Sequence, residues 1–453
     1  MLLDGGNKMA GLSSPLGDLP DGWRLAKLKQ LTKKIGSGAT PRGGQSAYLP
    51  IRDKFALVRS QNIFDRRFDA AGLSFISDAQ AQALANAQLQ RGDVLLNITG
   101  DGVTFGRACA VPEEVLPACV NQHVSVIRPD EKNLLSGYLL GYLTHPEIKS
   151  YVESFNSGGS RRAITKGHIE SFVVPLPPVC EQTRIASILG VLDDKIEINR
   201  RMNKTLEEMA QALFKSWFVD FDPVQAKAAG RKPFGMVDTA AALFPPHFEE
   251  SKLGPIPQAW SVAPLGESFE ITMGQSPPGE SFNELGEGLP FFQGRTDFGF
   301  RFPSRRMFTT QVTRLAQPRD TLVSVRAPVG DVNMAAERCC IGRGLAAVRH
   351  KAGNESFTFY AMQSLKDEFA VFEGDGTLFG SISGGSFRGL RFVCPSAPVR
   401  EQFEAQCCSL DEMIRNNESQ SQTLERLRDL LLPKLLSGEI RLRDAGRQVE
   451  AAL

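Results

Sequence analysis

The amino-acid sequence predicts an α+β protein in which two similar globular domains are joined by two long helices. We expect the helices to form an antiparallel coiled coil and the whole chain to be pseudo-two-fold symmetric. The prediction rests on a chain of 453 residues that is too long for one core, on an internal repeat across its two halves, and on a heptad pattern after each copy. A repeat of this size is too long for a solenoid, so it indicates a duplicated unit of one domain and one helix.

The repeat consists of short segments that recur in the same order in both halves. The matched pairs are 19–23 with 256–260, 38–41 with 274–277, 92–95 with 319–322, and 181–182 with 401–402. Within the first copy, short β-type runs alternate with two segments that predict helices, 79–89 and 136–156. Each copy ends in a proline-rich stretch that stops any regular element.

The strongest periodic pattern begins after each proline-rich stretch. In the first helix, positions spaced alternately by four and three residues are apolar apart from two asparagines: 185, 189, 192, 196, 199, 203, 206, 210, 213 and 217. Adding 218 to each position gives a matching set in the second helix, which only Arg428 interrupts. This 3.5-residue period predicts a left-handed coiled coil.

The order of domain, helix, domain and helix favours antiparallel pairing of the two helices. Pairing about centres near Arg201 and Ser419 forms a central polar layer, with Asn199 near Ser421 and Asn203 near Asn417. Such a layer in an apolar seam costs stability but fixes the register. The predicted segments are an N-terminal extension (1–18), a first domain (19–178), a central helix (179–221), a connector with one short helix (222–255), a second domain (256–397), a C-terminal helix (398–440) and a tail (441–453).

Composition excludes several classes of protein. Hydrophobic residues make up 42% and charged residues 23%, as in a globular protein, and the net charge is +1. The segment from Pro290 to His350 contains ten arginines and only four acidic residues. This excess of positive charge fits a solvated surface as well as a nucleic-acid-binding one. The eight cysteines include no CxxC pair, so we expect no metal site and reduced thiols in a cytoplasmic protein. We expect no signal peptide and no membrane span.

Motifs for catalysis are mostly missing. The sequence contains no GxxxxGK[ST] phosphate loop, no HExxH and no GxSxG. Asp101 lies in a tight turn after an apolar strand, but no partner acid or histidine recurs at the matching point of the second domain. We therefore predict no catalytic residue and no cofactor bound by this chain. The nuclease pattern of paired Asp and Glu with Lys is weak, and the sequence alone does not exclude it.

Polar residues recur in the loops that follow the predicted strands. Arg, Asn and Gln side chains can read base edges through paired hydrogen bonds, and Ser, Thr and Lys can hold phosphates. The candidates in the first domain are Arg59, Gln61, Asn62, Asn121, Gln122, His123, Arg161, Arg162 and Lys166, and those in the second are Gln293, Arg295, Arg326, Arg343, Ser381 and Ser383. For any one residue an ordinary surface loop is the alternative, but different side chains in a similar frame fit two domains that read two different sequences.

Four motifs, at 175–189, 212–224, 253–260 and 431–440, make the chain resemble the specificity subunits of type I DNA restriction–modification systems. With the duplication, the resemblance covers almost everything from Leu19 to Ile440. It implies two target recognition domains that each read half of a bipartite, asymmetric site in double-stranded DNA, with the coiled coil as a ruler between them. It also implies that this chain does no catalysis and that 212–224 and 431–440 are helix-end and partner-docking segments.

The resemblance implies partners as well. Two modification subunits would bind S-adenosylmethionine and dock on this chain, and restriction subunits, which are translocase-nucleases that use ATP and Mg²⁺, could join them. The leader before residue 18 and Arg428 depart from the family pattern. Two alternatives stay open: a stand-alone DNA-modifying enzyme with tandem domains, and a coiled-coil adaptor with two protein-binding heads and no DNA binding.

Overall fold

The computed structural model describes residues 13–157, 161–373 and 380–453 and divides into two compact units. Unit 1 comprises Met1–Ile198 and Gln420–Leu453, and unit 2 comprises Asn199–Ser419. Each unit holds one globular domain and one half of each long helix, because α5 spans Val179–Phe218 and α12 spans Ala397–Leu436. Most of the predicted N-terminal extension, 1–18, lies outside the described residues, but Leu16 packs against the core of unit 1.

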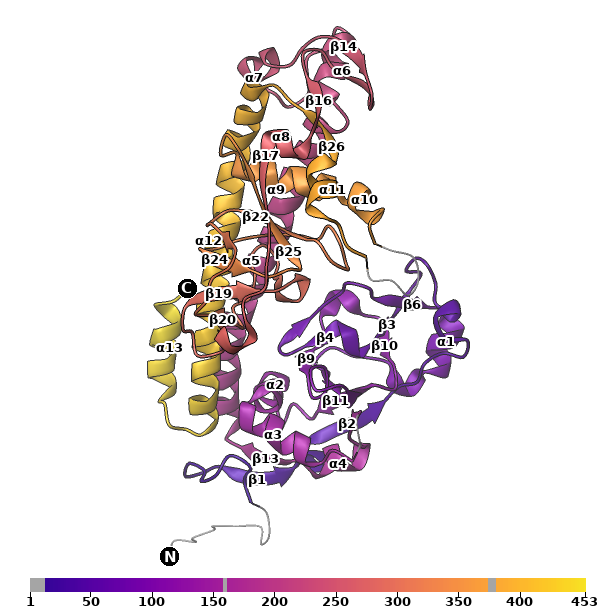
Figure 1. Cartoon of the computed structure of the whole chain (residues 1–453). Helices are drawn as coiled ribbons and strands as arrows, with labels where there is room; N and C mark the ends of the chain where they lie inside the picture. The colour runs from indigo at the N-terminus through magenta and orange to yellow at the C-terminus, as the bar shows by residue number, and fades with distance from the viewer. Residues whose placement is uncertain (1–12, 158–160, 374–379) are drawn as a thin grey trace, which may run out of the picture. The chain divides into compact units, whose positions relative to one another are not determined.

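The domain of unit 1 is built on a four-stranded antiparallel sheet in the order β2-β11-β7-β9. Figure 1 labels β2, β11 and β9 of this sheet. Its strands are β2 (Thr32–Ser37), β11 (Val124–Pro129), β7 (Val94–Asn97) and β9 (Ala108–Ala110). A second sheet pairs β10 (Ala118–Val120) in parallel with β3 (Phe55–Val58), which also pairs with β6 (Ser74–Ile76). A ribbon of β1 (Arg24–Lys27) and β13 (Val173–Leu176) then leads the chain into α5.

The domain of unit 2 repeats this topology. Its main sheet has the order β17-β25-β22-β23, with β17 (Phe269–Met273), β25 (Leu345–His350), β22 (Thr321–Ser324) and β23 (Val332–Met334). The parallel pair is β19 (Leu289–Phe292) with β24 (Cys339–Ile341), and the ribbon before α12 is β16 (Ser261–Pro264) with β26 (Arg391–Cys394). The α+β class and the duplication predicted from the sequence are confirmed.

Some predicted helices differ in detail. The segment 136–156 forms two helices, α2 (Ser136–Thr144) and α3 (Pro146–Ser154), because Pro146 has no backbone N–H to continue α2 and instead begins α3. The segment 79–89 is shorter than predicted and consists of α1 (Asp78–Ala83) followed by a 3₁₀ turn at Ala85–Ala87. The remaining domain helices are α4 (Lys166–Ser171), α8 (Leu265–Ser268), α9 (Glu355–Ser364), α10 (Lys366–Ala370) and α11 (Gly384–Gly389).

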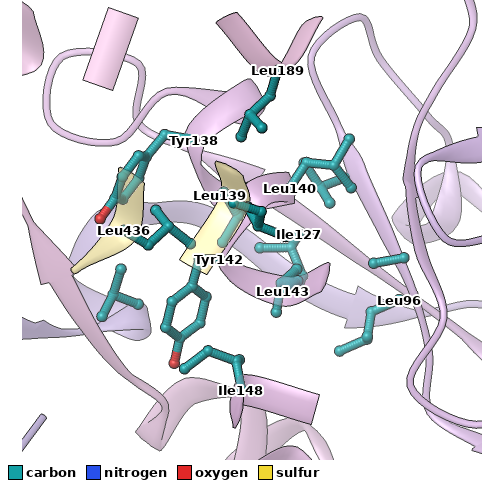
Figure 2. Close-up of a cluster of buried hydrophobic side chains, with 14 of the residues drawn as sticks. Leu96, Ile127, Tyr138, Leu139, Leu140, Tyr142, Leu143, Ile148, Leu189 and Leu436 are labelled. Carbon is teal, nitrogen blue, oxygen red and sulfur yellow. The ribbon is translucent and has the colours of Figure 1, made fainter. Parts of the chain in front are cut away.

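The core of unit 1 lies where α2 packs against both long helices. Figure 2 shows the side chains of α2 beside Leu189 of α5 and Leu436 of α12, all of which are buried. The hydroxyl of Tyr138 donates to the carbonyl of Pro175 at 2.7 Å, so this buried polar atom is satisfied. In unit 2 the equivalent core is aromatic, and Phe214 of α5 contacts Phe403 of α12 at 5.5 Å between ring centroids.

The two long helices are antiparallel partners. In unit 2, Asn203 of α5 is hydrogen-bonded to Asn417 of α12. Further along α5, Glu207 binds Arg301, which also binds Asp411 of α12. The partners on α12 therefore run backward as α5 runs forward. In unit 1, Asp193 of α5 pairs with Arg428 of α12. Most predicted seam positions are buried, which confirms the heptad assignment.

The connector and the C-terminal segment carry more structure than predicted. Besides the expected short helix, α7 (Asp238–Ala242), the connector contains α6 (Asp222–Ala228) and a hairpin of β14 (Phe248–Ser251) and β15 (Gly254–Pro257). The predicted tail, 441–453, forms α13 (Leu442–Glu450), whose Ala445 and Val449 are buried in the core of unit 1. None of the helices in the described residues is both long and apolar enough to cross a membrane.

Candidate nucleic-acid interface

Three of the predicted loops converge at one edge of the domain in unit 1. The amide of Asn121 donates to the carbonyl of Val58 at 3.1 Å, which joins the loop 121–123 to the loop 59–62. Ile98 donates to His123 at 3.0 Å, and Ile164 donates to Ile98 at 3.0 Å, which brings in the loop around Arg161. Backbone hydrogen bonds thus hold together loops that are far apart in sequence.

The domain of unit 2 contains the same three backbone hydrogen bonds. Gly342 donates to Phe292 at 2.8 Å, Val325 donates to Gly344 at 2.9 Å, and Ile382 donates to Val325 at 3.0 Å. The loops 293–296, 342–344 and 381–384 are therefore the counterparts of the loops in unit 1. We call each set, 59–62 with 121–123 and 161–166, and 293–296 with 342–344 and 381–384, a loop cluster.

A fourth repeated segment supports each cluster and explains one of the sequence repeats. A Cβ atom on Gly38 would lie 1.7 Å from the carbonyl oxygen of Val120, and one on Gly274 would lie 2.2 Å from that of Gly342. No side chain fits at either position, so the backbone after the first sheet strand can lie directly against the central loop. The segments 38–41 and 274–277 recur because both domains need this close approach.

In unit 1 the exposed part of the loop cluster carries mixed polar groups. Gln122 is exposed and accepts a hydrogen bond from the hydroxyl of Thr40. The ring of His123 lies 2.5 Å from the hydroxyl of Thr99 through Nδ1. Partial burial, with a smaller contribution from the positive charge of Arg161, lowers the pKa of His123. The lowered pKa favours the neutral ring, which can both donate and accept hydrogen bonds.

Other candidates in unit 1 serve the fold. Asn62 is fully buried, and its side chain bonds the backbone of residues 59, 69 and 71. The side chain of Asn121 is also buried and accepts from the amide of His123 at 3.0 Å. Five candidates remain. Arg161 is exposed. Partners on the same domain engage the other four: Arg59 and Gln61 donate to the carbonyl of Gly72, Arg162 pairs with Glu153, and Lys166 pairs with Glu170.

In unit 2 the loop cluster is more cationic. Arg326 and Arg343 are exposed and form no ion pair within the described part of the chain. Gln293 is exposed beside them, whereas Arg295 is engaged by Asp331. Ser381 is exposed and bridges to the backbone of Arg326, and the hydroxyl of Ser383 caps α11 by accepting from the amide of Ser386 at 3.1 Å.

The arginines between Pro290 and His350 do not form one uniform surface. Six of the ten are in ion pairs: Arg295, Arg301, Arg305, Arg306, Arg319 and Arg349. Of the four without an ion pair in the described ranges, Arg343 lies on the loop cluster, and Arg326 lies beside it through its bridge to Ser381. Three further hydroxyls contact the clusters but were not predicted from the sequence: Thr40 bonds Gln122, Thr99 bonds His123, and Ser276 accepts from the amide of Arg343 at 3.4 Å. The repeat of 38–41 at 274–277 was the signal that could have found Thr40 and Ser276.

Three of the four residues predicted for the polar layer, Asn199, Asn203 and Asn417, lie in unit 2. The side-chain amide of Asn417 donates to Oδ1 of Asn203 at 2.8 Å, and Asn203 donates to Glu418 at 3.1 Å. Asn199 donates to the backbone carbonyl of Asn417 at 3.4 Å. Ser421, in unit 1, is buried.

The described residues show no metal centre. No group of three or more His, Cys, Asp or Glu side chains that could hold a metal ion occurs among them. All eight cysteines are free thiols, and five of them are buried. Burial raises the pKa of Cys119 to about 11, so this thiol is protonated and unreactive.

Comparison with known proteins gives one consistent family. A family model described as the type I restriction modification DNA specificity domain matches residues 66–208. The chain is 27% identical to a Methanocaldococcus jannaschii protein assigned as the MjaX type I restriction enzyme specificity subunit, over 94% of this chain and 96% of that one. It is 24% identical to the HindI specificity subunit of Haemophilus influenzae, over 84% of this chain and 94% of that one.

Among solved structures, the fold resembles the type I restriction-modification system S subunit from M. genitalium. The TM-score is 0.54 at 14% identity, and the match covers 93% of this chain and 99% of that structure. The duplicated domains and the paired helices therefore agree with the fold of that structure, and the two relatives match this chain over most of its length. The chain belongs to the specificity subunits of type I restriction–modification systems, which are a non-catalytic part of those complexes.

Proposed function

We propose that each loop cluster contacts one half of a bipartite, asymmetric DNA site, so that 19–178 and 256–397 are the two target recognition domains. The observation that carries this proposal is the pair of equivalent backbone frames with different exposed side chains. Gln122 and His123 in unit 1 stand where Arg343 and Gly344 stand in unit 2. Because different donors and acceptors read different base edges, the two frames suit two different half-sites.

The proposal also assigns this chain a scaffolding role in the cytoplasm, where its DNA lies. Two modification subunits would dock on the paired helices, with 212–224 and 431–440 as docking segments, and restriction subunits would join that complex. S-adenosylmethionine, ATP and Mg²⁺ would then act on the partner subunits. The polar layer of Asn199, Asn203, Asn417 and Ser421 would fix the register of the helices.

A matched pair of arginine variants tests the recognition role. Arg343 follows β24 on the loop cluster, whereas Arg338 is also exposed and precedes the same strand. The complex with the modification subunits should first be used to find the methylated sequence. We then expect Arg343→Gln to weaken binding by about 1–3 kcal/mol on DNA with both half-sites intact. Arg338→Gln should bind as the wild type does.

The half-site dependence decides between the alternatives. Scrambling the half-site read by the second domain should reduce the DNA affinity of Arg343→Gln less than that of the wild type. Scrambling the half-site read by the first domain should reduce the affinity of both proteins equally. Equal effects on both halves would contradict the assignment of one domain to one half-site. Modification or cleavage of DNA by the purified chain alone would favour a stand-alone enzyme. A complex with the modification subunits that binds no DNA at any salt concentration would favour an adaptor.

A further inference from the structure

The two domains share a small hairpin that carries an arginine toward the long helices. In unit 1 it is β4 (Ile63–Phe64) with β5 (Arg67–Phe68), and Ile63 pairs with Phe68. In unit 2 the matching bridge joins Phe298 to Pro303, 235 residues further on at both ends. The amide of Asp69 donates to Asn62 at 2.8 Å, and that of Ser304 donates to Asp297 at 2.8 Å. Arg66 and Arg301 thus occupy the same place in the two hairpins.

Arg66 binds the first long helix inside unit 1. Its Nε and Nη2 atoms lie 2.7 and 2.6 Å from Oδ2 of Asp193 on α5, and its side chain is only 5% exposed. Nη1 donates to the hydroxyl of Thr144 on α2 at 3.3 Å. The other oxygen of Asp193 accepts from Arg428 of α12 at 3.0 Å. One carboxylate therefore connects the hairpin to both long helices.

Arg301 does the same in unit 2 from a more buried position. Nη1 lies 2.6 Å from Asp411 of α12, and Nη2 lies 3.2 Å from Glu207 of α5. The guanidinium carbon lies 4.0 Å from the ring centroid of Phe359. Burial alone would lower the pKa of Arg301, but Tyr360, Asp411 and Glu207 outweigh burial and raise it. The side chain is therefore a fixed cation, held by a salt bridge to each helix.

Asp193 and Asp411 are themselves equivalent, because 218 residues separate them, as they separate the two sets of seam positions. The ion pair between the hairpin arginine and the helix aspartate is thus repeated in both units, although no short sequence motif marks it. The planar guanidinium donates in fixed directions, so each contact restrains the orientation of the hairpin as well as its distance from the helices.

We propose that Arg66 and Arg301 are positioning residues that hold each recognition domain at one angle on the helix pair, and so restrict the DNA spacer that the complex accepts. The inference rests on the proposed function. Adding one base pair to a spacer moves a half-site by roughly 3.4 Å along the duplex and rotates it by roughly 34°. A domain held by a rigid ion pair cannot follow that rotation, whereas a released domain can.

Arg66 is the better test position, because Arg428 still neutralises Asp193 when Arg66 is replaced. The variants are Arg66→Met, which keeps the aliphatic length, and Arg66→Lys, which keeps the charge. The control is Lys149→Met, since Lys149 pairs with Asp65 on the same hairpin at 2.7 Å and belongs to the same domain. Each full-length variant is combined with the modification subunits, and methylation is measured on DNA whose spacer is the natural length or one base pair shorter or longer.

We expect the wild type, Arg66→Lys and Lys149→Met to methylate the natural spacer at least about tenfold more than either altered spacer. Arg66→Met should narrow that ratio to about threefold or less while keeping the same half-site sequences. Arg66→Met that is inactive on all spacers, with Arg66→Lys active, also supports the inference. A wild-type ratio in Arg66→Met, or loss of activity in both Arg66 variants, would overturn it. Failure of the wild type to require two half-sites would instead overturn the proposed function.

Discussion

The carboxylate of Asp411 accepts a hydrogen bond from the guanidinium of Arg301 at 2.6 Å, at the helix position where Asp193 receives Arg66 in the other unit. The duplication therefore includes the contact between each domain and its following helix. It also accounts for Arg428, which interrupts the apolar seam, because Arg428 shares the carboxylate of Asp193. A cation at a seam position is tolerated where an acid on the facing helix neutralises it.

Removing the buried arginine of unit 2 should destabilise the protein strongly. Arg301→Met leaves Asp411 and Glu207 without their cation, and breaking a buried ion pair from one side costs about 3–5 kcal/mol. Arg305→Met is the control, because Arg305 and its partner Glu337 are solvent-exposed and such pairs contribute about 0–1 kcal/mol. The free energy of unfolding from urea denaturation measures both. Equal losses in the two variants would contradict the assigned role of Arg301.

Gly36 in β2 and Gly38 directly after that strand should respond very differently to alanine. The Cβ atom of Gly38→Ala would meet the carbonyl oxygen of Val120, whereas that of Gly36→Ala would have no atom within 4 Å. We expect a loss of about 1–3 kcal/mol for Gly38→Ala and a change within about 0.5 kcal/mol for Gly36→Ala. Chemical denaturation of the two variants checks this, and similar midpoints would show that the close approach is unimportant.

Acid should destabilise unit 2 through His350. Burial, with smaller contributions from Arg400 and Lys351, lowers the pKa of His350 to about 4, and Nδ1 accepts from the amide of Ala352 at 3.1 Å. In the unfolded chain the pKa is about 6.5, so the unfolded state takes up the proton first as the pH falls. Stability from the neutral ring is present above pH 6.5 and is lost between about pH 6.5 and 4.

The variant His350→Asn lacks this titration. Its melting temperature should therefore fall less between pH 7 and pH 5 than that of the wild type, even if it is lower at pH 7. The exposed His247 provides the control, and His247→Asn should follow the wild type at both pH values. If the melting temperatures of all three proteins fall equally between pH 7 and pH 5, His350 is not the cause of the acid destabilisation.

The asparagine pair of the helix seam should behave as a coupled unit. Asn203→Leu removes the acceptor of the Asn417 side chain and should cost about 1–3 kcal/mol. Replacing both asparagines with leucine should recover much of that loss, because an apolar seam needs no hydrogen bonds. A double-mutant cycle by urea denaturation measures the coupling energy, and strictly additive effects would show that the two side chains act independently.

Much of the architecture was readable from the sequence because the signals are periodic or repeated. The heptads in 185–217 predicted the seam of α5, since burial of one helix face requires apolar residues at that spacing. The recurring short segments predicted two similar domains, and the loops after their strands were placed correctly relative to one another. These features depend on local spacing, which a single sequence displays.

The tertiary structure decided which polar residues face solvent and which support the fold. Asn62 and Asn121 looked like base readers, but their side chains are buried on backbone groups. The roles of Arg66 and Arg301 could not be predicted from the sequence, because their partners Asp193 and Asp411 lie 127 and 110 residues away. The role of a polar side chain depends on what long-range packing brings against it, and no local pattern in the chain encodes that.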